Sequence, residues 1–264
     1  MPINLSTKSF VECNMPAIRI NALAKVLGAQ TYLEIGVRSG TTFFEVDIKN
    51  KFAVDPKFMF DTNAYAKDGH LHFFAVTSDE FFSLIGASKH RNLFFDIIFI
   101  DGLHTFEQSF TDFKNSLPFA HDKTVWIVDD TIPSSPYSAM PVMEDAFSLY
   151  QRLGYKKRPW HGDVFKTMFA LHDFYLEYSF CSLLEKSQSV IWKTPEPSSR
   201  KPVFGSLEAI AALSYFDVLR HAKLFRPVPE HMMLSTVGTS AEFSYGPTLW
   251  ESFVRKVNKE DFAD

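Results

Sequence analysis

The sequence has few of the features that mark secreted, membrane-spanning or nucleic-acid-binding proteins. Its 264 residues include two cysteines, Cys13 and Cys181, which are too few for a disulfide framework and lie outside any metal-type spacing. No apolar stretch approaches the roughly 20 residues that span a bilayer, and the first residues lack a signal-peptide pattern. The net charge is −4 and the basic residues are dispersed, apart from residues 156–158. We therefore expect a cytoplasmic protein without membrane or nucleic-acid partners.

Glycine is also missing from one informative place. The strand predicted at residues 31–37 is not followed by G-x-G-x-x-G, the spacing that brings backbone amides onto the pyrophosphate of a dinucleotide. Gly36 and Gly40 instead lie four residues apart, and Glu34 precedes the first by two. A carboxylate here repels a phosphate, whereas it attracts an ammonium group such as that of S-adenosylmethionine. A tight turn without any ligand is the structural alternative.

The apolar patterns alternate between strand and helix along most of the chain. This alternation predicts an α/β fold with a mostly parallel sheet covered by helices on both faces, and an antiparallel hairpin at one edge. The seven predicted strands span residues 31–37, 51–54, 72–76, 97–100, 125–128, 176–183 and 189–193. One predicted helix begins near residue 15, and another ends near residue 173. The other predicted helices span residues 41–47, 80–88, 142–153, 206–221 and 248–257.

We divide the chain into three parts on this pattern. Residues 1–30 form a helical cover, residues 31–195 the main domain, and residues 196–264 a C-terminal extension after a linker rich in proline and serine. The amphipathic pattern within the extension fits either a lid over the site or an oligomer contact. We expect a homo-oligomer.

Aspartates follow the two central strands of this predicted sheet. Asp101 ends the strand at residues 97–100, and Asp129 and Asp130 end the strand at residues 125–128. Strand ends lie about 4.8 Å apart in a parallel sheet, so these acids can share Mg²⁺ or Mn²⁺. Asp129 and Asp130 can converge only if the strand has already broken, because successive strand residues point to opposite faces.

A histidine and a further aspartate complete the candidate chemistry. His104, three residues after Asp101, could remove a proton from a hydroxyl whose acidity the metal has raised. Asp55, at the tip of the second strand, is placed to accept hydrogen bonds from a ribose diol. The structural alternative is that Asp101 and His104 cap and pack a loop, and that Asp55 is a solvated strand end.

Four motifs in this order resemble the class I S-adenosylmethionine-dependent methyltransferases. They are YLEIGVRSGTTF, FIDGLHTFE, IVDD and GDVFK, and they are similar to a metal-dependent branch related to macrolide-sugar and cephalosporin-pathway O-methyltransferases. The resemblance covers roughly residues 15–195. It implies a Rossmann-like sheet, magnesium ligands Asp101, Asp129 and Asp130, His104 as general base, and cofactor contacts from Glu34, Gly36, Ser39, Gly40, Asp55, Ser78, Asp79 and Asp101. Asp129 departs from the family, where glutamate is frequent.

The acceptor is less well determined by the sequence. Trp160 and His161 precede the GDVFK motif in a loop expected near the strand tips, and Asp163 and Lys166 within it could contact substrate or form a structural ion pair. We expect an O-methyltransferase acting on a small-molecule hydroxyl, of a sugar or secondary metabolite. The alternatives are a nicotinamide-dependent oxidoreductase, which needs the missing phosphate cradle, and a non-catalytic binding protein on a methyltransferase scaffold.

Overall fold

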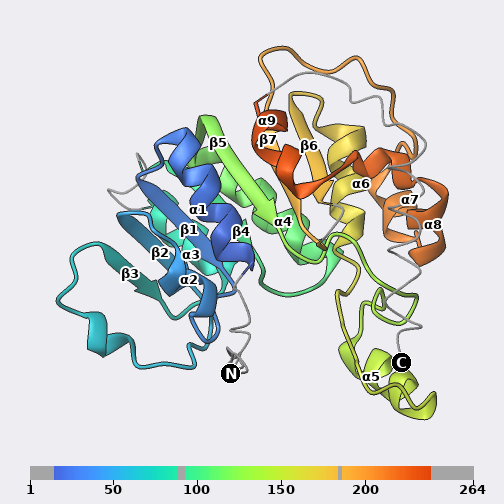
Figure 1. Cartoon of the computed structure of the whole chain (residues 1–264), viewed down its shortest axis with the longest axis horizontal. Coiled ribbons are helices and arrows are strands. Elements are labelled where there is room, and N and C mark those ends of the chain that lie inside the picture. The colour runs from blue at the N-terminus through green and yellow to red at the C-terminus, as the bar shows by residue number, and fades with distance from the viewer. Residues whose placement is uncertain (1–14, 88–92, 184–185, 239–264) are drawn as a thin grey trace, which may run out of the picture.

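An eight-stranded sheet forms the centre of the computed structural model, which describes residues 15–87, 93–183 and 186–238 (Figure 1). The strand order is β3-β2-β1-β4-β5-β7-β6-β8, and β7 alone among the described strands runs antiparallel to its neighbours. The strands are β1 (Thr31–Ile35), β2 (Asn50–Val54), β3 (Leu71–Phe74), β4 (Phe95–Ile100), β5 (Ala120–Val128), β6 (Tyr178–Leu183), β7 (Ser189–Lys193) and β8 (Pro227–Val228). The predicted mostly parallel sheet and the β6–β7 hairpin are confirmed.

The two faces of the sheet carry separate helical layers. Helices α1 and α2, with α9, pack on one core, while α3, α4, α6, α7 and α8 pack on the other. Their bounds are α1 (Met15–Leu27), α2 (Thr41–Glu45), α3 (Ser78–Ala87), α4 (Phe106–Ser116), α5 (Met143–Arg152), α6 (Phe165–Phe174), α7 (Leu207–Ala211), α8 (Tyr215–Arg220) and α9 (Met233–Thr236). None of the described helices is long and apolar enough to cross a membrane.

Strand β4 shows why the sheet is covered on both sides. Ile97 and Phe99 belong to the core beneath α1, whereas Ile98 and Ile100 belong to the core beneath α4, and all four are buried. Successive strand residues point to opposite faces, so a continuous apolar run requires a helix layer on each face. The strand therefore emerges into solvent only at its ends, where Asp96 and Asp101 lie.

The C-terminal extension differs from its prediction in two ways. The single helix expected at residues 206–221 is two helices, because Ser214 starts a new one: its backbone N–H and its hydroxyl both donate to Asp217 Oδ2, at 2.9 and 3.0 Å. The extension also supplies β8, which pairs with β6, so the sheet has eight strands and the hairpin is not its edge. The predicted helix at residues 248–257 lies outside the described residues.

The described part of the extension is integrated with the main domain. Ile210, Val218 and Phe225 are fully buried in the core beneath α4, and Val228 is buried in the core beneath α1. By contrast, the chain between β5 and α6 makes an excursion that carries α5 away from the body of the protein, in the lower right of Figure 1. The excursion and the first βα turns meet at the carboxyl end of the sheet.

Candidate functional site

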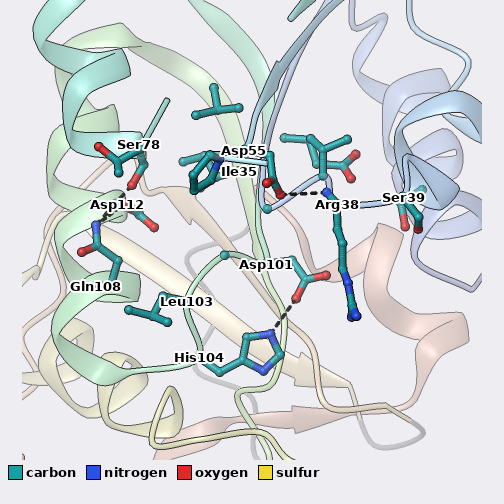
Figure 2. Close-up of a pocket in the computed structure, with 18 of the residues that line it drawn as sticks. Ile35, Arg38, Ser39, Asp55, Ser78, Asp101, Leu103, His104, Gln108 and Asp112 are labelled. Carbon is teal, nitrogen blue, oxygen red and sulfur yellow. Dashed lines mark hydrogen bonds and ion pairs between the residues drawn. The ribbon is translucent and has the colours of Figure 1, made fainter. Parts of the chain in front are cut away.

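A cavity of about 780 Å³ opens at the carboxyl ends of the parallel strands (Figure 2). It extends from the first βα turn, past the tips of β2 and β4, to the first turns of α3 and α4. Ligands bind at this edge in open α/β sheets. Seven of the eight predicted cofactor contacts line it: Glu34, Gly36, Ser39, Asp55, Ser78, Asp79 and Asp101. Gly40 does not; it precedes α2, where a Cβ would meet the ring of Phe44 at 2.4 Å.

Glu34 lies beneath the cavity as a buried acid. Its side chain accepts a hydrogen bond of 2.6 Å from the Tyr32 hydroxyl, and the residue is 2% exposed. Burial is the largest cause that raises the pKa of Glu34, to about 8, even though the Tyr32 hydrogen bond opposes the change. Nearby Lys51 donates to two backbone carbonyls, at 2.8 and 3.0 Å. A positive ligand group beside Glu34 would therefore favour its charged form.

Gly36 is required by a close approach of two strand ends. It has a φ of +91°, and a Cβ at this position would lie 2.0 Å from the carbonyl oxygen of Asp101. The Gly36 N–H donates to the Val54 carbonyl, and the Asp101 N–H donates to the Ile35 carbonyl, each at 2.9 Å. No other residue fits this left-handed conformation against a neighbouring backbone. The glycine thus sets how closely the first turn and Asp101 approach one another.

Asp55 holds the first turn in place from the neighbouring strand. Its Oδ2 accepts from the Arg38 N–H at 2.8 Å (Figure 2). Its Oδ1 accepts from the Lys57 N–H at 2.7 Å. Arg38 has a positive φ of 46°, and the contact stabilises this turn. A carboxylate has about four acceptor positions, so Asp55 retains capacity for a ligand hydroxyl.

A polar wall at the far end of the cavity was missed by the sequence reasoning. Gln108 Nε2 on α4 donates to Ser78 Oγ at 3.2 Å and to Asp112 Oδ1 at 2.9 Å (Figure 2). Asp112 is 1% exposed, and burial raises its pKa to about 6. The sequence signal was the i, i+4 spacing of Gln108 and Asp112 on a helix that begins directly after the site loop.

His104 lies between two of the predicted metal-binding aspartates. Its Nδ1 is 2.8 Å from Asp130 Oδ2 and its Nε2 is 3.5 Å from Asp101 Oδ1. Burial alone would lower the pKa of His104, but the hydrogen bonds to Asp101 and Asp130 raise it to about 10. Burial, together with the charge of Asp130, raises the pKa of Asp101. The imidazolium thus offsets part of the negative charge of two crowded carboxylates.

Asp129 and Asp130 diverge after the end of β5. Asp130 has a φ of +58° and faces His104, whereas Asp129 Oδ2 accepts from Gln188 Nε2 at 2.9 Å. Donor atoms of Asp101, His104 and Asp130 lie within 4.8 Å of one another, and Asp129 is not in this group. The structure therefore brings two of the three predicted metal ligands together and adds His104; the role of Asp129 as a ligand stays a prediction.

The residues proposed to contact substrate fall into two groups. The Trp160 ring lies against His104 with centroids 5.0 Å apart and planes at 10°, and Trp160 lines the cavity. His161 Nε2 lies 3.7 Å from Asp130 Oδ1. Asp163 and Lys166 are buried behind the site and form an ion pair at 2.9 Å, which is the structural alternative foreseen for them.

This ion pair supports the loop that carries His104. Asp163 Oδ1 accepts from the Phe106 N–H at 2.7 Å, at the start of α4, and Lys166 Nζ also donates to the Ala211 carbonyl at 2.7 Å. Gly162 has a φ of +59°, and a Cβ there would lie 1.6 Å from the His104 carbonyl oxygen. The GDVFK motif therefore packs directly against the backbone of the site loop.

The donor set fits a divalent cation. The carboxylates of Asp101 and Asp130 converge with the imidazole of His104. The protonated imidazole supplies the positive charge that a metal would otherwise supply to the two carboxylates. Carboxylates favour Mg²⁺ and Mn²⁺, while imidazole ligands favour transition metals. The residues present thus agree with the implied metal through Asp101 and Asp130.

Comparison with known proteins finds a family match for part of the chain. Residues 33–131 match a family model described as a methyltransferase domain, in agreement with the resemblance predicted from the sequence. No curated protein matches the chain.

Several solved structures are similar at low identity. A Staphylococcus aureus protein provisionally assigned as a caffeoyl-CoA O-methyltransferase is 15% identical, with 69% of this chain and 84% of that chain covered and a TM-score of 0.49. The Bacillus cereus O-methyltransferase in complex with S-adenosylhomocysteine is 13% identical (69% and 81% covered, TM-score 0.45). TomG from Streptomyces achromogenes, in complex with S-adenosylmethionine, is 13% identical (66% and 77% covered, TM-score 0.44).

Proposed function

We propose that the protein is a metal-dependent O-methyltransferase that uses S-adenosylmethionine, because residues 33–131 match a family model described as a methyltransferase domain. The observation that carries the proposal is the position of the Asp101, His104 and Asp130 cluster, which adjoins the large cavity at the carboxyl edge of the sheet. Cofactor and acceptor would meet where the cavity reaches His104 and Trp160.

The cavity walls support binding of the cofactor. A volume of about 780 Å³ suits a ligand of nucleoside size. Glu34 would lie near the ammonium group, which would return it to its charged form, and Asp55 would accept from the ribose hydroxyls. Ser39, Ser78 and Asp79 line the same cavity and would make further contacts, with Gly36 and Gly40 shaping the turn.

Asp101 and Asp130 would hold Mg²⁺ or Mn²⁺, with Asp129 adjacent. When bound, the metal would lower the pKa of an acceptor hydroxyl and orient it toward the methyl group. His104 would then remove the proton. His104 is protonated while it lies between the two carboxylates, so this role requires a cation to replace its positive charge.

The acceptor is proposed as a small-molecule hydroxyl, with a sugar or a secondary metabolite as the substrate class. Trp160 and His161 would contact it, because Trp160 lies over His104 and His161 lies beside Asp130. Asp163 and Lys166 would act on it only through the loop they support. We also propose that the chain divides into a helical cover (residues 1–30), a main domain (31–195) and a C-terminal extension (196–264), and that the protein is a homo-oligomer.

Two measurements on the purified protein test this proposal. Calorimetric titration should show binding of S-adenosylhomocysteine and none of NAD, because the first turn lacks the phosphate-binding spacing. Transfer of a labelled methyl group to pools of sugars and phenols should require Mg²⁺ or Mn²⁺ and stop with EDTA. Binding of NAD alone would favour the oxidoreductase alternative, and cofactor binding without transfer to any pool would favour a binding protein.

A further inference from the structure

A buried arginine lies behind the candidate site, outside the cavity. Arg19 on α1 is 2% exposed, and its Nη1 donates to Gln188 Oε1 at 2.7 Å. Its Nε donates to Glu230 Oε1 at 2.5 Å, in the C-terminal extension. Burying a charge is costly unless it is paired and hydrogen-bonded. These two contacts therefore fix the guanidinium at the junction of α1, the β6–β7 turn and the extension.

Arg19 determines which way the Gln188 amide faces. A guanidinium can only donate, so the Gln188 atom beside it must be the oxygen, and the amide nitrogen must face the other way. That nitrogen donates to Asp129 Oδ2 at 2.9 Å. Asp129 Oδ1 in turn accepts from the Asp130 N–H at 2.9 Å. An unbroken chain of hydrogen bonds thus runs from Glu230 to the backbone of Asp130.

The backbone at Asp130 needs such support. Its φ of +58° is unusual for a residue with a side chain, and such conformations persist only where the surroundings impose them. The next residue, Thr131, donates to the Ser187 carbonyl through both its N–H, at 2.7 Å, and its hydroxyl, at 3.0 Å. The β6–β7 turn therefore holds Asp130 from both sides.

We propose that Arg19 and Gln188 are positioning residues that keep the Asp129–Asp130 turn in its left-handed conformation. The turn directs the Asp130 carboxylate to within 2.8 Å of His104. Through Glu230, the C-terminal extension becomes part of this support, a role distinct from a lid or an oligomer contact. The link to metal binding rests on the proposed function; the link to the geometry of Asp130 does not.

The first test is the substitution Arg19→Met, read by titration of Mn²⁺ with electron paramagnetic resonance. Loss of an outer-shell partner should weaken Mn²⁺ binding roughly 10- to 100-fold. Affinity for S-adenosylhomocysteine should stay the same, because Arg19 does not line the cavity. The matched control is Arg226→Met, which removes an arginine of the extension whose Nη1 donates to Ser179 Oγ at 2.6 Å. Equal Mn²⁺ affinity in Arg19→Met and wild type would overturn the proposal.

A second variant tests the order of the chain and covers the case in which Arg19→Met does not fold. Gln188→Leu removes the contact to Asp129 and leaves the Arg19–Glu230 pair intact. Combined with Arg19→Met, it should bind Mn²⁺ no more weakly than Gln188→Leu alone, because both changes break the same path. Multiplicative losses would show two independent structural effects and contradict a shared path.

A crystal structure of Gln188→Leu or Arg19→Met provides a readout without metal. We expect the Asp130 carboxylate to leave His104 and its φ to relax to a negative value. If wild type binds no Mn²⁺ but the variants release Asp130, the positioning role stands and the metal proposal fails. If Asp130 keeps its place in both variants, the positioning role is wrong, whatever the metal affinity.

Discussion

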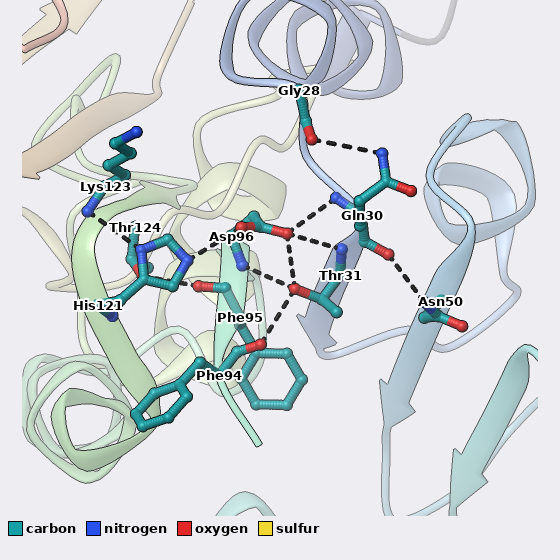
Figure 3. Close-up of polar contacts among 10 residues, drawn as sticks. All are labelled: Gly28, Gln30, Thr31, Asn50, Phe94, Phe95, Asp96, His121, Lys123 and Thr124. Carbon is teal, nitrogen blue, oxygen red and sulfur yellow. Dashed lines mark hydrogen bonds and ion pairs between the residues drawn. The ribbon is translucent and has the colours of Figure 1, made fainter. Parts of the chain in front are cut away.

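The two ends of strand β4 carry aspartate–histidine pairs with opposite electrostatics. At the amino end, Asp96 Oδ2 accepts three hydrogen bonds of 2.8 to 2.9 Å, from the Gln30 N–H, the Thr31 N–H and the Thr31 hydroxyl (Figure 3). Asp96 Oδ1 lies 2.9 Å from His121 Nε2. Burial opposes ionisation of Asp96, but these hydrogen bonds outweigh it and lower its pKa. At the carboxyl end, Asp101 has a raised pKa because burial and the charge of Asp130 dominate.

The difference separates a structural acid from the acid that is proposed to bind the metal. Asp96 receives donors from the backbone, so its charge is satisfied whatever else binds to the protein. Asp101 shares a single imidazole with Asp130, so its charge is satisfied only while a cation remains between them. A crowded pair of carboxylates with one removable cation is the arrangement expected of a metal or catalytic site.

The largest expected effect comes from exchanging the two histidines for alanine. His104→Ala should lower the rate of methyl transfer about 10²- to 10⁴-fold, the usual contribution of a general base, while His121→Ala should leave the rate unchanged. Initial rates at saturating S-adenosylmethionine and Mg²⁺ measure both variants. Similar rates for His104→Ala and wild type would remove His104 from the chemistry while leaving the fold intact.

The next effect compares two lysine–aspartate pairs. Lys166→Met leaves the buried Asp163 carboxylate without its cation and should lower the free energy of unfolding by about 3 kcal/mol. Lys193→Met breaks the exposed pair with Asp122 and should lower the free energy of unfolding much less, because solvent screens that pair. Urea denaturation measures both.

The two lysine variants should also differ in activity. Methyl transfer should fall further in Lys166→Met than in Lys193→Met, because Asp163 caps the helix that follows His104. Equal stabilities of the two variants would show that the buried pair contributes no more than the exposed one.

Sequence patterns predicted the sheet because each strand is a compact apolar run followed by a turn. They also placed Asp101 and Asp130 at adjacent strand ends, which the register of β4 and β5 confirms. They could not predict that Asp129 and Asp130 diverge. That outcome depends on the left-handed residue Asp130 and on the contact of the next residue, Thr131, with Ser187 in the β6–β7 turn, 56 residues later in the chain.

Other parts of the site were hidden for similar reasons. Arg19 looks like a surface residue in an amphipathic helix, and its burial depends on Glu230, 211 residues away. The helix predicted at residues 206–221 followed a continuous amphipathic pattern, and the break at Ser214 had only a local S-x-x-D signal. Long-range partners of single polar residues cannot be deduced from periodicity.

The affinity for a divalent metal should increase with pH, by about tenfold per pH unit at most, because binding releases one proton. His104 is protonated below its pKa of about 10 in the metal-free protein, so a cation bound between Asp101 and Asp130 must displace that proton. Affinity for Mn²⁺ should therefore rise between pH 6 and 8.5, as measured by calorimetry in buffers of different ionisation enthalpy. His104→Gln should flatten the dependence, and an unchanged slope in that variant would assign the proton to another group.

The smallest effect concerns the structural acid at the other end of β4. Asp96→Asn should lower the free energy of unfolding by about 1 kcal/mol at pH 7, since Asp96 is only partly buried and solvent screens its charge. The pKa of Asp96 is lower in the folded protein than its usual 3.8, so its contribution is complete above that value and is lost as the pH falls through the folded pKa. The difference in urea midpoint between wild type and Asp96→Asn should therefore shrink as the pH falls below 3.8, while methyl transfer at pH 7 is the same in both. A loss of activity comparable to that of His104→Ala would mean that the two ends of the strand do not differ in role.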